Sequence, residues 1–115
     1  MYPKNIAKLA ISAMLEKKSE DVLLLKVGEV TDIADYFVIA SCDTEIQARA
    51  VADAVEMKLK RKGLLPHHIE GYEYAHWILM DYVSVVIHIF QKPYRIYYGL
   101  ERLWGDVPVE EFREE

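Results

Sequence analysis

The chain has 115 residues, of which 52% are hydrophobic and 29% charged. This length indicates one folded domain, and this composition excludes a disordered polypeptide. Its formal net charge of −5 argues against nonspecific nucleic-acid binding, which requires a basic surface. A single cysteine, Cys42, excludes an internal disulfide bond and gives no sign of an oxidising compartment.

The first predicted element is a helix from Pro3 to about Leu15, because apolar residues recur there at helical spacing and proline favours the first helical position. A nearly continuous apolar run, Val22–Val27, then predicts a strand that is covered on both faces. A polar connection, residues 28–35, leads into a second buried strand at Tyr36–Ser41.

Thr44 and Gln47 have the spacing of a capping box, which predicts a long helix that ends at Gly63. Residues 64–69 predict a weak strand. Because Pro66 cannot donate a backbone hydrogen bond, we expect this strand at an edge of the sheet.

The next stretch predicts a hairpin with strands at His76–Met80 and Ser84–Phe90. Side chains alternate between the faces of a strand, and one face of this hairpin is purely apolar and must be buried. That face carries Ile78, Met80, Val85, Ile87 and Ile89. The other face mixes an indole, a carboxylate and an imidazole with apolar groups, so it fits either a core or an exposed docking surface.

The expected hairpin register places Asp81 opposite Ser84, and therefore Trp77 opposite His88. From that position the imidazole would either orient the indole for a partner or be a hydrogen-bonded residue of the sheet. The sequence leaves both roles open.

Residues 94–104 predict one or two short helical turns that break at Gly99, with their aromatic side chains in core packing. Residues 109–115 predict an acidic, mobile tail beyond a domain that spans residues 1–108. The order of elements predicts an α/β fold, a single domain with a mixed sheet of about five strands and helices packed on it.

The candidate catalytic and metal-binding residues form no complete site. His67 and His68 are adjacent, and the two other histidines lack a zinc-like spacing, so we predict no metal site. Asp32 and Asp35 could act as paired carboxylates, but an ordinary loop also explains them. No glycine-rich phosphate loop is present, and we predict neither a cofactor nor an enzymatic activity.

Charge is distributed unevenly along the chain. Residues 63–91 contain no lysine or arginine, whereas Glu70, Glu73 and Asp81 lie among them. An acidic hairpin favours a basic protein partner over RNA. The basic stretch Lys58–Lys62 is interpreted as a solvated helix end that the helix dipole favours.

A series of motifs in consistent order carries a resemblance to a known family. These motifs are Asp32–Ile39, Glu70-Gly71, Trp77 with Asp81-Tyr82, His88 with Phe90, and Arg95, Tyr98, Leu100-Glu101 and Leu103-Trp104. Together they resemble the ribosomal silencing factor family, also called the Iojap family, over residues 6–106.

The resemblance implies a nucleotidyltransferase-like topology without nucleotidyl transfer. It also implies a protein that binds the large ribosomal subunit through large-subunit ribosomal protein fourteen, blocks joining of the small subunit and lowers translation when nutrients are scarce. The chain departs from the family at Ser41-Cys42, where Ser-Gly is usual, and at Val83-Ser84, where Gly-Asp is usual. Without that glycine, a tight two-residue turn at Tyr82-Val83 is less favourable.

The hairpin face and the resemblance together predict a partner-binding surface. It comprises Glu70, Gly71, Trp77, Leu79, Asp81, Tyr82, Val86 and His88. Trp77 is the expected anchor, Leu79 and Val86 give apolar support and Asp81 supplies the charge. We expect little or no direct RNA contact.

Two alternatives remain open. One is a nucleotidyltransferase-like enzyme that uses Asp32 and Asp35 with a divalent metal, and the other is a homodimeric scaffold. A homodimer of the free chain also remains open. We expect no membrane contact and a cytoplasmic location, because no apolar run approaches the roughly 20 residues of a membrane helix. Residues 1–4 also lack the features of a signal or transit peptide.

Overall fold

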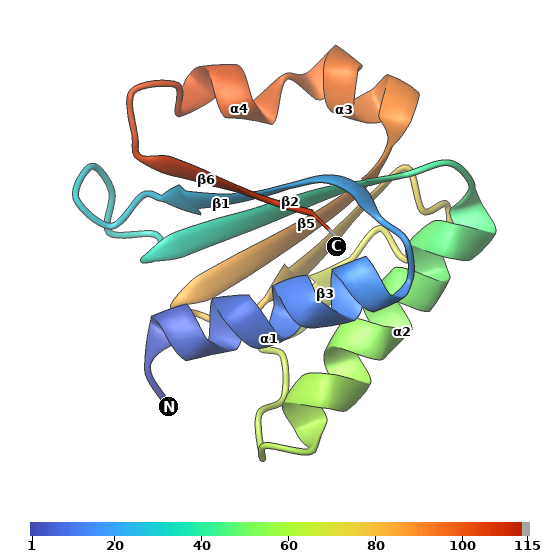
Figure 1. Cartoon of the computed structure of the whole chain (residues 1–115), viewed down its shortest axis with the longest axis horizontal. Coiled ribbons are helices and arrows are strands. Elements are labelled where there is room, and N and C mark those ends of the chain that lie inside the picture. The colour runs from blue at the N-terminus through green and yellow to red at the C-terminus, as the bar shows by residue number, and fades with distance from the viewer. Residues whose placement is uncertain (114–115) are drawn as a thin grey trace.

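The computed structural model describes residues 1–113, which form helices on both faces of a mixed sheet (Figure 1). The helices are α1 (Pro3–Glu16), α2 (Glu45–Lys60), α3 (Lys92–Tyr98) and α4 (Leu100–Leu103). The strands are β1 (Glu20–Lys26), β2 (Tyr36–Cys42), β3 (His68–Glu70), β4 (Trp77–Asp81), β5 (Val85–Gln91) and β6 (Val109–Phe112). None of the described helices is both long and apolar enough to cross a membrane.

The sheet has six strands in the order β3-β4-β5-β2-β1-β6. Strands β2 and β5 pair in parallel at its centre, and the other neighbours are antiparallel. The predicted α/β class is therefore confirmed, with one strand more than expected. The weak strand expected at residues 64–69 is shorter, because β3 begins only after Pro66, and it lies at a sheet edge as predicted.

One face of the sheet packs against α1 and α2, which lie together below it in Figure 1. The apolar hairpin face belongs to this core, since Ile78, Met80 and Ile87 are fully buried. From the helices, Met14 and Val55 are equally inaccessible to solvent. The alternation of side chains along the hairpin therefore assigned its apolar face to the core correctly.

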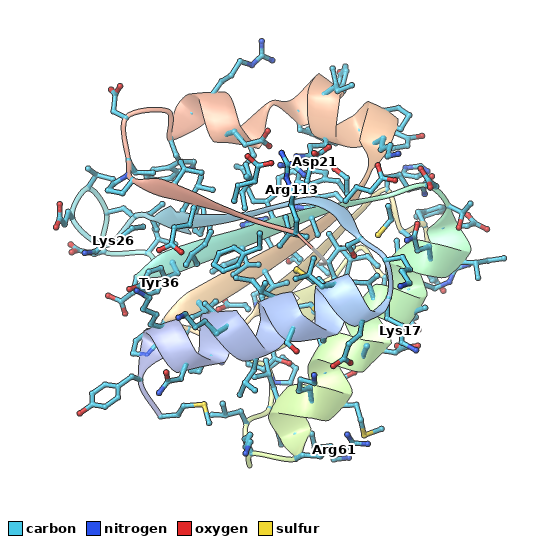
Figure 2. All side chains as sticks on the ribbon, viewed as in Figure 1. Lys17, Asp21, Lys26, Tyr36, Arg61 and Arg113 are labelled. Carbon is cyan, nitrogen blue, oxygen red and sulfur yellow. The ribbon has the colours of Figure 1, made fainter. Side chains whose placement is uncertain are left out.

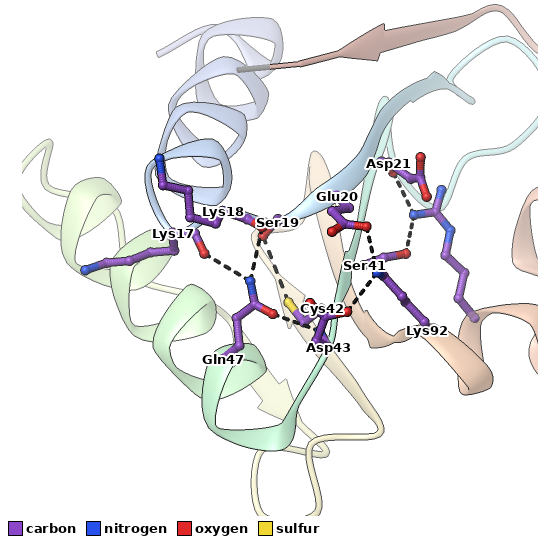
Figure 3. Close-up of polar contacts among 11 residues, drawn as sticks. Lys17, Lys18, Ser19, Glu20, Asp21, Ser41, Cys42, Asp43, Gln47 and Lys92 are labelled. Carbon is purple, nitrogen blue, oxygen red and sulfur yellow. Dashed lines mark hydrogen bonds and ion pairs between the residues drawn. The ribbon is translucent and has the colours of Figure 1, made fainter. Parts of the chain in front are cut away.

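Polar contacts join the end of α1 to the start of α2, as Figure 3 shows. The Thr44 hydroxyl accepts a hydrogen bond from the Gln47 backbone N–H at 3.0 Å, as an N-cap residue should. The Gln47 amide nitrogen donates to the carbonyl oxygens of Lys17 and Lys18, each at 3.1 Å. The predicted capping residue pair thus also fixes the two helices to each other.

The opposite face of the sheet is covered by α3 and α4, which lie above it in Figure 1. Gly99 separates the two helices with φ of 57°, a left-handed conformation that glycine adopts readily. Leu100 and Val107 pack onto Phe37 and Phe90 in this second core. The predicted break at Gly99 and the short helical turns are confirmed.

The C-terminal segment differs from the prediction. Val109–Phe112 is strand β6, which pairs with the outer edge of β1 so that Val22 lies opposite Phe112. The prediction of a tail that begins at residue 109 is therefore wrong for these residues, because the free edge of β1 offers unpaired backbone groups that an extended segment can satisfy. Residues 114–115 of the expected tail lie outside the described residues.

Candidate interaction surface

The hairpin register differs from the expected one by two residues. Asp81 lies opposite Val86 rather than Ser84, and Trp77 lies opposite Phe90. The prediction that Trp77 faces His88 is therefore wrong. A shift of two residues leaves every side chain on its predicted face, because side chains alternate with a period of two.

The turn between the strands explains the shift. Four residues, Tyr82 to Val85, lie between the opposite residues Asp81 and Val86, two more than in the two-residue turn that the sequence suggested. The Tyr82 backbone N–H donates to the Val85 carbonyl at 2.9 Å, and the Val83 N–H donates to the Asp81 carboxylate at 2.7 Å. Val83 has φ of 70°, which is uncommon for a β-branched residue.

Three residues predicted to contact a partner are buried. Val86 and His88 lie under α3 and α4 with exposed fractions of 7% and 3%, and Tyr82 packs in the core on the opposite face. Direct contact of these three side chains with a partner is therefore contradicted. Parity identified the mixed face of the hairpin, but it could not show that the following helices return over part of that face.

The other predicted residues keep some exposure. Glu70, Asp81 and the half-buried Trp77 and Leu79 share one side of the neighbouring strands β3 and β4, where Glu70 lies opposite Leu79. The side chain of Glu70 is 69% exposed and that of Asp81 is 25% exposed.

Trp77 contacts three other rings. Its indole stacks on Phe90 at a centroid distance of 4.9 Å, and Tyr98 of α3 lies at the same distance. The indole Nε1–H donates a hydrogen bond of 3.1 Å to His88 Nδ1. We call Glu70, Trp77, Leu79, Asp81 and Tyr98 the docking surface, because they combine a fixed indole, an aliphatic side chain, a tyrosine and two carboxylates.

The exposed apolar residues of α3 and α4 were missed, because the sequence was interpreted as core packing throughout residues 94–104. Ile96, Tyr97 and Tyr98 are 77%, 77% and 47% exposed, and Leu103 is 76% exposed. A signal was present: three consecutive apolar residues cannot all face the sheet from one short helix. Only Arg95 of α3 is buried among the residues described.

Gly71 has a structural role beside this surface. Its φ is 78°, and a Cβ atom built on it would lie 2.1 Å from the Trp77 carbonyl oxygen. Gly71 therefore positions the backbone of Trp77.

The loop that follows Gly71 is attached to α2. The Tyr72 hydroxyl donates to the Asp53 carboxylate at 2.9 Å, and Arg49 donates to the Glu73 carbonyl at 2.8 Å.

Imidazole and carboxylate groups share the acidic edge of the docking surface. His68 lies 3.5 Å from the Glu70 carboxylate and 3.6 Å from that of Asp81. The imidazole of His68 therefore contacts both carboxylates of this edge.

The two carboxylates of the enzyme alternative lie on one exposed connection. Asp32 and Asp35 are both exposed in the connection between β1 and β2. Within residues 1–113, no group of three or more histidine, cysteine, aspartate or glutamate side chains is placed to hold a metal ion. Burial raises the pKa of the Cys42 thiol to about 11, so at neutral pH this thiol is protonated and weakly nucleophilic.

Side chains of the chain itself pair with one another at the carboxyl ends of the parallel strands β2 and β5, the position where α/β sheets commonly bind ligands. Lys92 Nζ lies 2.7 Å from a carboxylate oxygen of Glu20 and 2.7 Å from one of Asp43, and these contacts raise the pKa of Lys92 (Figure 3). Arg95 donates to the Ser41 hydroxyl at 2.8 Å. These contacts attach α3 to the sheet.

Comparisons with known proteins match nearly the whole chain. A family model described as "Ribosomal silencing factor during starvation" matches residues 2–115. Ribosomal silencing factor RsfS of Halalkalibacterium halodurans is 39% identical over 96% of this chain and 95% of that protein. The Bacillus subtilis protein of the same name is 38% identical over 95% and 92%. A crystal structure of a Chromobacterium violaceum protein matches with a TM-score of 0.89 at 35% identity, covering 91% of this chain and 88% of that one.

Proposed function

The chain belongs to the ribosomal silencing factor family, and on that premise we propose that it binds the large ribosomal subunit through large-subunit ribosomal protein fourteen. Bound there, it sterically blocks joining of the small subunit and represses translation when nutrients are limiting. The matched family model and relatives confirm the resemblance that the sequence motifs indicated.

The docking surface is the observation that carries this proposal. Trp77 and Tyr98 are residue types that often anchor protein interfaces, and their rings are in contact. Leu79 extends the apolar area along β4 on the same side of the sheet. A half-buried indole with fixed neighbours loses little conformational freedom on binding, which favours affinity.

Charge supports a protein partner at this surface. Glu70 and Asp81 flank the apolar residues, and residues 63–91 contain no lysine or arginine. A basic ribosomal protein is complementary to such a surface, whereas RNA phosphates would be repelled from it. The proposal therefore keeps direct RNA contact at this surface to a minimum.

Action by occlusion requires no catalytic group. The proposed activity is that of a bound protein that occupies the subunit interface, without an enzyme reaction, cofactor or metal. Because its proposed partner is the ribosome, the site of action is the cytoplasm. Pairing of two free chains would compete for the same docking surface.

Sedimentation with isolated subunits tests the proposal. The chain should pellet with large subunits and not with small subunits. Trp77→Ala should weaken this binding by more than about 2 kcal/mol, or roughly 30-fold, if Trp77 is a central anchor. Ile46→Ala is the matched control, because Ile46 is an exposed apolar residue of α2, on the opposite layer of the fold.

Undiminished binding by a folded Trp77→Ala variant would refute the assigned surface, and equal binding to both subunits would refute the proposed target. Size-exclusion chromatography of the free chain addresses self-association. If two chains pair through the docking surface, Trp77→Ala should convert the dimer to a monomer while Ile46→Ala leaves it unchanged.

A further inference from the structure

His88 occupies a buried position directly beneath the docking surface. It is 3% exposed, and its ring meets Phe37 of β2 edge-on at a centroid distance of 5.0 Å. The imidazole is therefore held by the sheet and the second core. Its side chain is too deeply buried to contact a partner. It contacts Trp77, however, which is only half-buried.

The hydrogen bond between these residues fixes the protonation of the imidazole. Nδ1 of His88 accepts the bond from the Trp77 indole, so Nδ1 carries no proton. The neutral ring must then hold its proton on Nε2. That Nε2–H is buried without a hydrogen-bond partner among the described residues, so the arrangement leaves one donor unsatisfied.

The same bond determines which part of the indole a partner meets. Because the only N–H of the indole ring is directed inward to His88, the ring offers only carbon atoms to a partner. A partner group placed against this indole then needs no hydrogen-bond acceptor. Apolar side chains and cations over the ring face satisfy that requirement.

We propose that His88 is a positioning residue for the docking surface: as a rigid acceptor, its Nδ1 locks the Trp77 indole with the N–H inward and the carbon surface toward the partner. This inference rests on the proposed function, because the surface is the one assigned there to ribosome binding. It adds that the partner contacts Trp77 through an apolar or cationic group.

Two variants of similar chemistry separate an acceptor from simple packing. His88→Asn places its oxygen on Cγ, where His88 carries Nδ1, whereas His88→Gln extends its oxygen one bond further. His88→Leu removes the acceptor and keeps the bulk. We expect Asn to retain most large-subunit binding, and Gln and Leu to lose about tenfold, which is the scale of one hydrogen bond.

A Trp77→Phe background supplies the matched control, because phenylalanine has no N–H to donate. There, the three His88 substitutions should bind alike. The positioning role is overturned if the Asn variant binds large subunits no better than the Leu variant. It is also overturned if the Asn variant still binds better than the Leu variant in the Trp77→Phe background. Thermal melts on the same variants show whether affinity follows stability instead, which would also overturn it.

A measurement on the unaltered protein keeps the test independent of folding and of the ribosome. Hydrogen exchange of the two indole N–H groups, followed by NMR, should show strong protection of Trp77. Exchange at the rate of a free indole would overturn the proposal. Failure of the wild-type chain to sediment with large subunits would refute the proposed function while leaving a protected Trp77 N–H in place.

Discussion

Val83 is the most strained residue of the hairpin. Its backbone is in the left-handed region with φ of 70°, and its side chain is 66% exposed, so no packing compensates for the strain. An L-residue in this region is disfavoured by roughly 1–2 kcal/mol, and β-branching adds to the crowding. The departure from the family noted at Val83-Ser84 therefore has a physical consequence.

Val83→Gly should stabilise the protein by about 1 kcal/mol, because relief of the strain exceeds the entropy that glycine loses on folding. Urea unfolding measures the change as a shift in midpoint. Ser84→Gly, in the same turn, is the control and should be neutral or destabilising, since Ser84 has no positive φ. A gain for Ser84→Gly as large as that for Val83→Gly would contradict the strain argument.

His88 makes stability dependent on pH. Burial lowers the pKa of His88 from 6.5 to about 4, so the unfolded chain binds a proton more readily than the folded one. Stability contributed by this group is complete above pH 6.5 and falls as the pH drops toward 4, by about 3 kcal/mol.

Unfolding free energies measured between pH 7 and pH 4 for the wild type and for His88→Leu isolate this contribution, because all other titrating groups are common to both. The wild type should lose more stability over that range. Parallel curves for the two proteins would contradict a buried, neutral imidazole.

At the scale of elements, periodicity predicted the helices and the central strands. Alternation in the hairpin separated Ile78 and Met80 from Trp77 and Leu79 correctly, because parity depends only on the chain itself. The register of the hairpin depends on the length of its turn. The burial of its mixed face depends on helices that lie later in the sequence. For that reason the pairing of Trp77 was wrong, and the burial of Val86 under α3 and α4 was not foreseen.

The C-terminal strand shows the same limit. Glu110 and Glu111 resemble a solvated tail, and nothing in their local sequence indicates a partner. The strand forms because β1 presents a free edge about 85 residues earlier in the chain. The sequence predicted Glu70, Trp77, Leu79 and Asp81 of the docking surface, whereas the exposed side of α3 was missed although its three consecutive apolar residues gave a signal.

The loop between β3 and β4 provides a test at this scale. Gly71→Ala should destabilise the protein by about 2 kcal/mol or more and weaken subunit binding, because the new Cβ would collide with the Trp77 carbonyl. Gly63→Ala is a matched control: its φ is 80°, but nothing lies within 4 Å of its Cβ position. It should lose only the roughly 1–2 kcal/mol of backbone strain. Equal losses would mean that contact with Trp77 has no role.

Across the whole molecule, lysines and arginines are unevenly distributed. Lysines and arginines gather on α1 and at the end of α2, the layer in which Figure 2 labels Lys17 and Arg61. The docking surface lies on the other side of the sheet, with Glu70 and Asp81 at its edge. The carboxylates at that edge bias the approach of the chain toward a basic partner.

Binding to large subunits should weaken only gently as salt rises, because the few carboxylates of the docking surface contribute about 0–1 kcal/mol each. Co-sedimentation over a range of potassium chloride concentrations gives the slope. A steep loss would indicate that phosphates are neutralised. If replacing Lys60, Arg61 and Lys62 with glutamate removed that slope, RNA contact through the end of α2 would replace the protein contact proposed here.

Strand β6 also has a consequence for aggregation. β1 contains consecutive leucines, Leu23–Leu25, and Val109–Phe112 pairs with its outer edge. Without that pairing, the sheet would end in a leucine-rich strand whose free backbone groups favour aggregation. With it, the sheet ends in a strand that carries Glu110 and Glu111, and charges at a sheet edge oppose pairing with another chain.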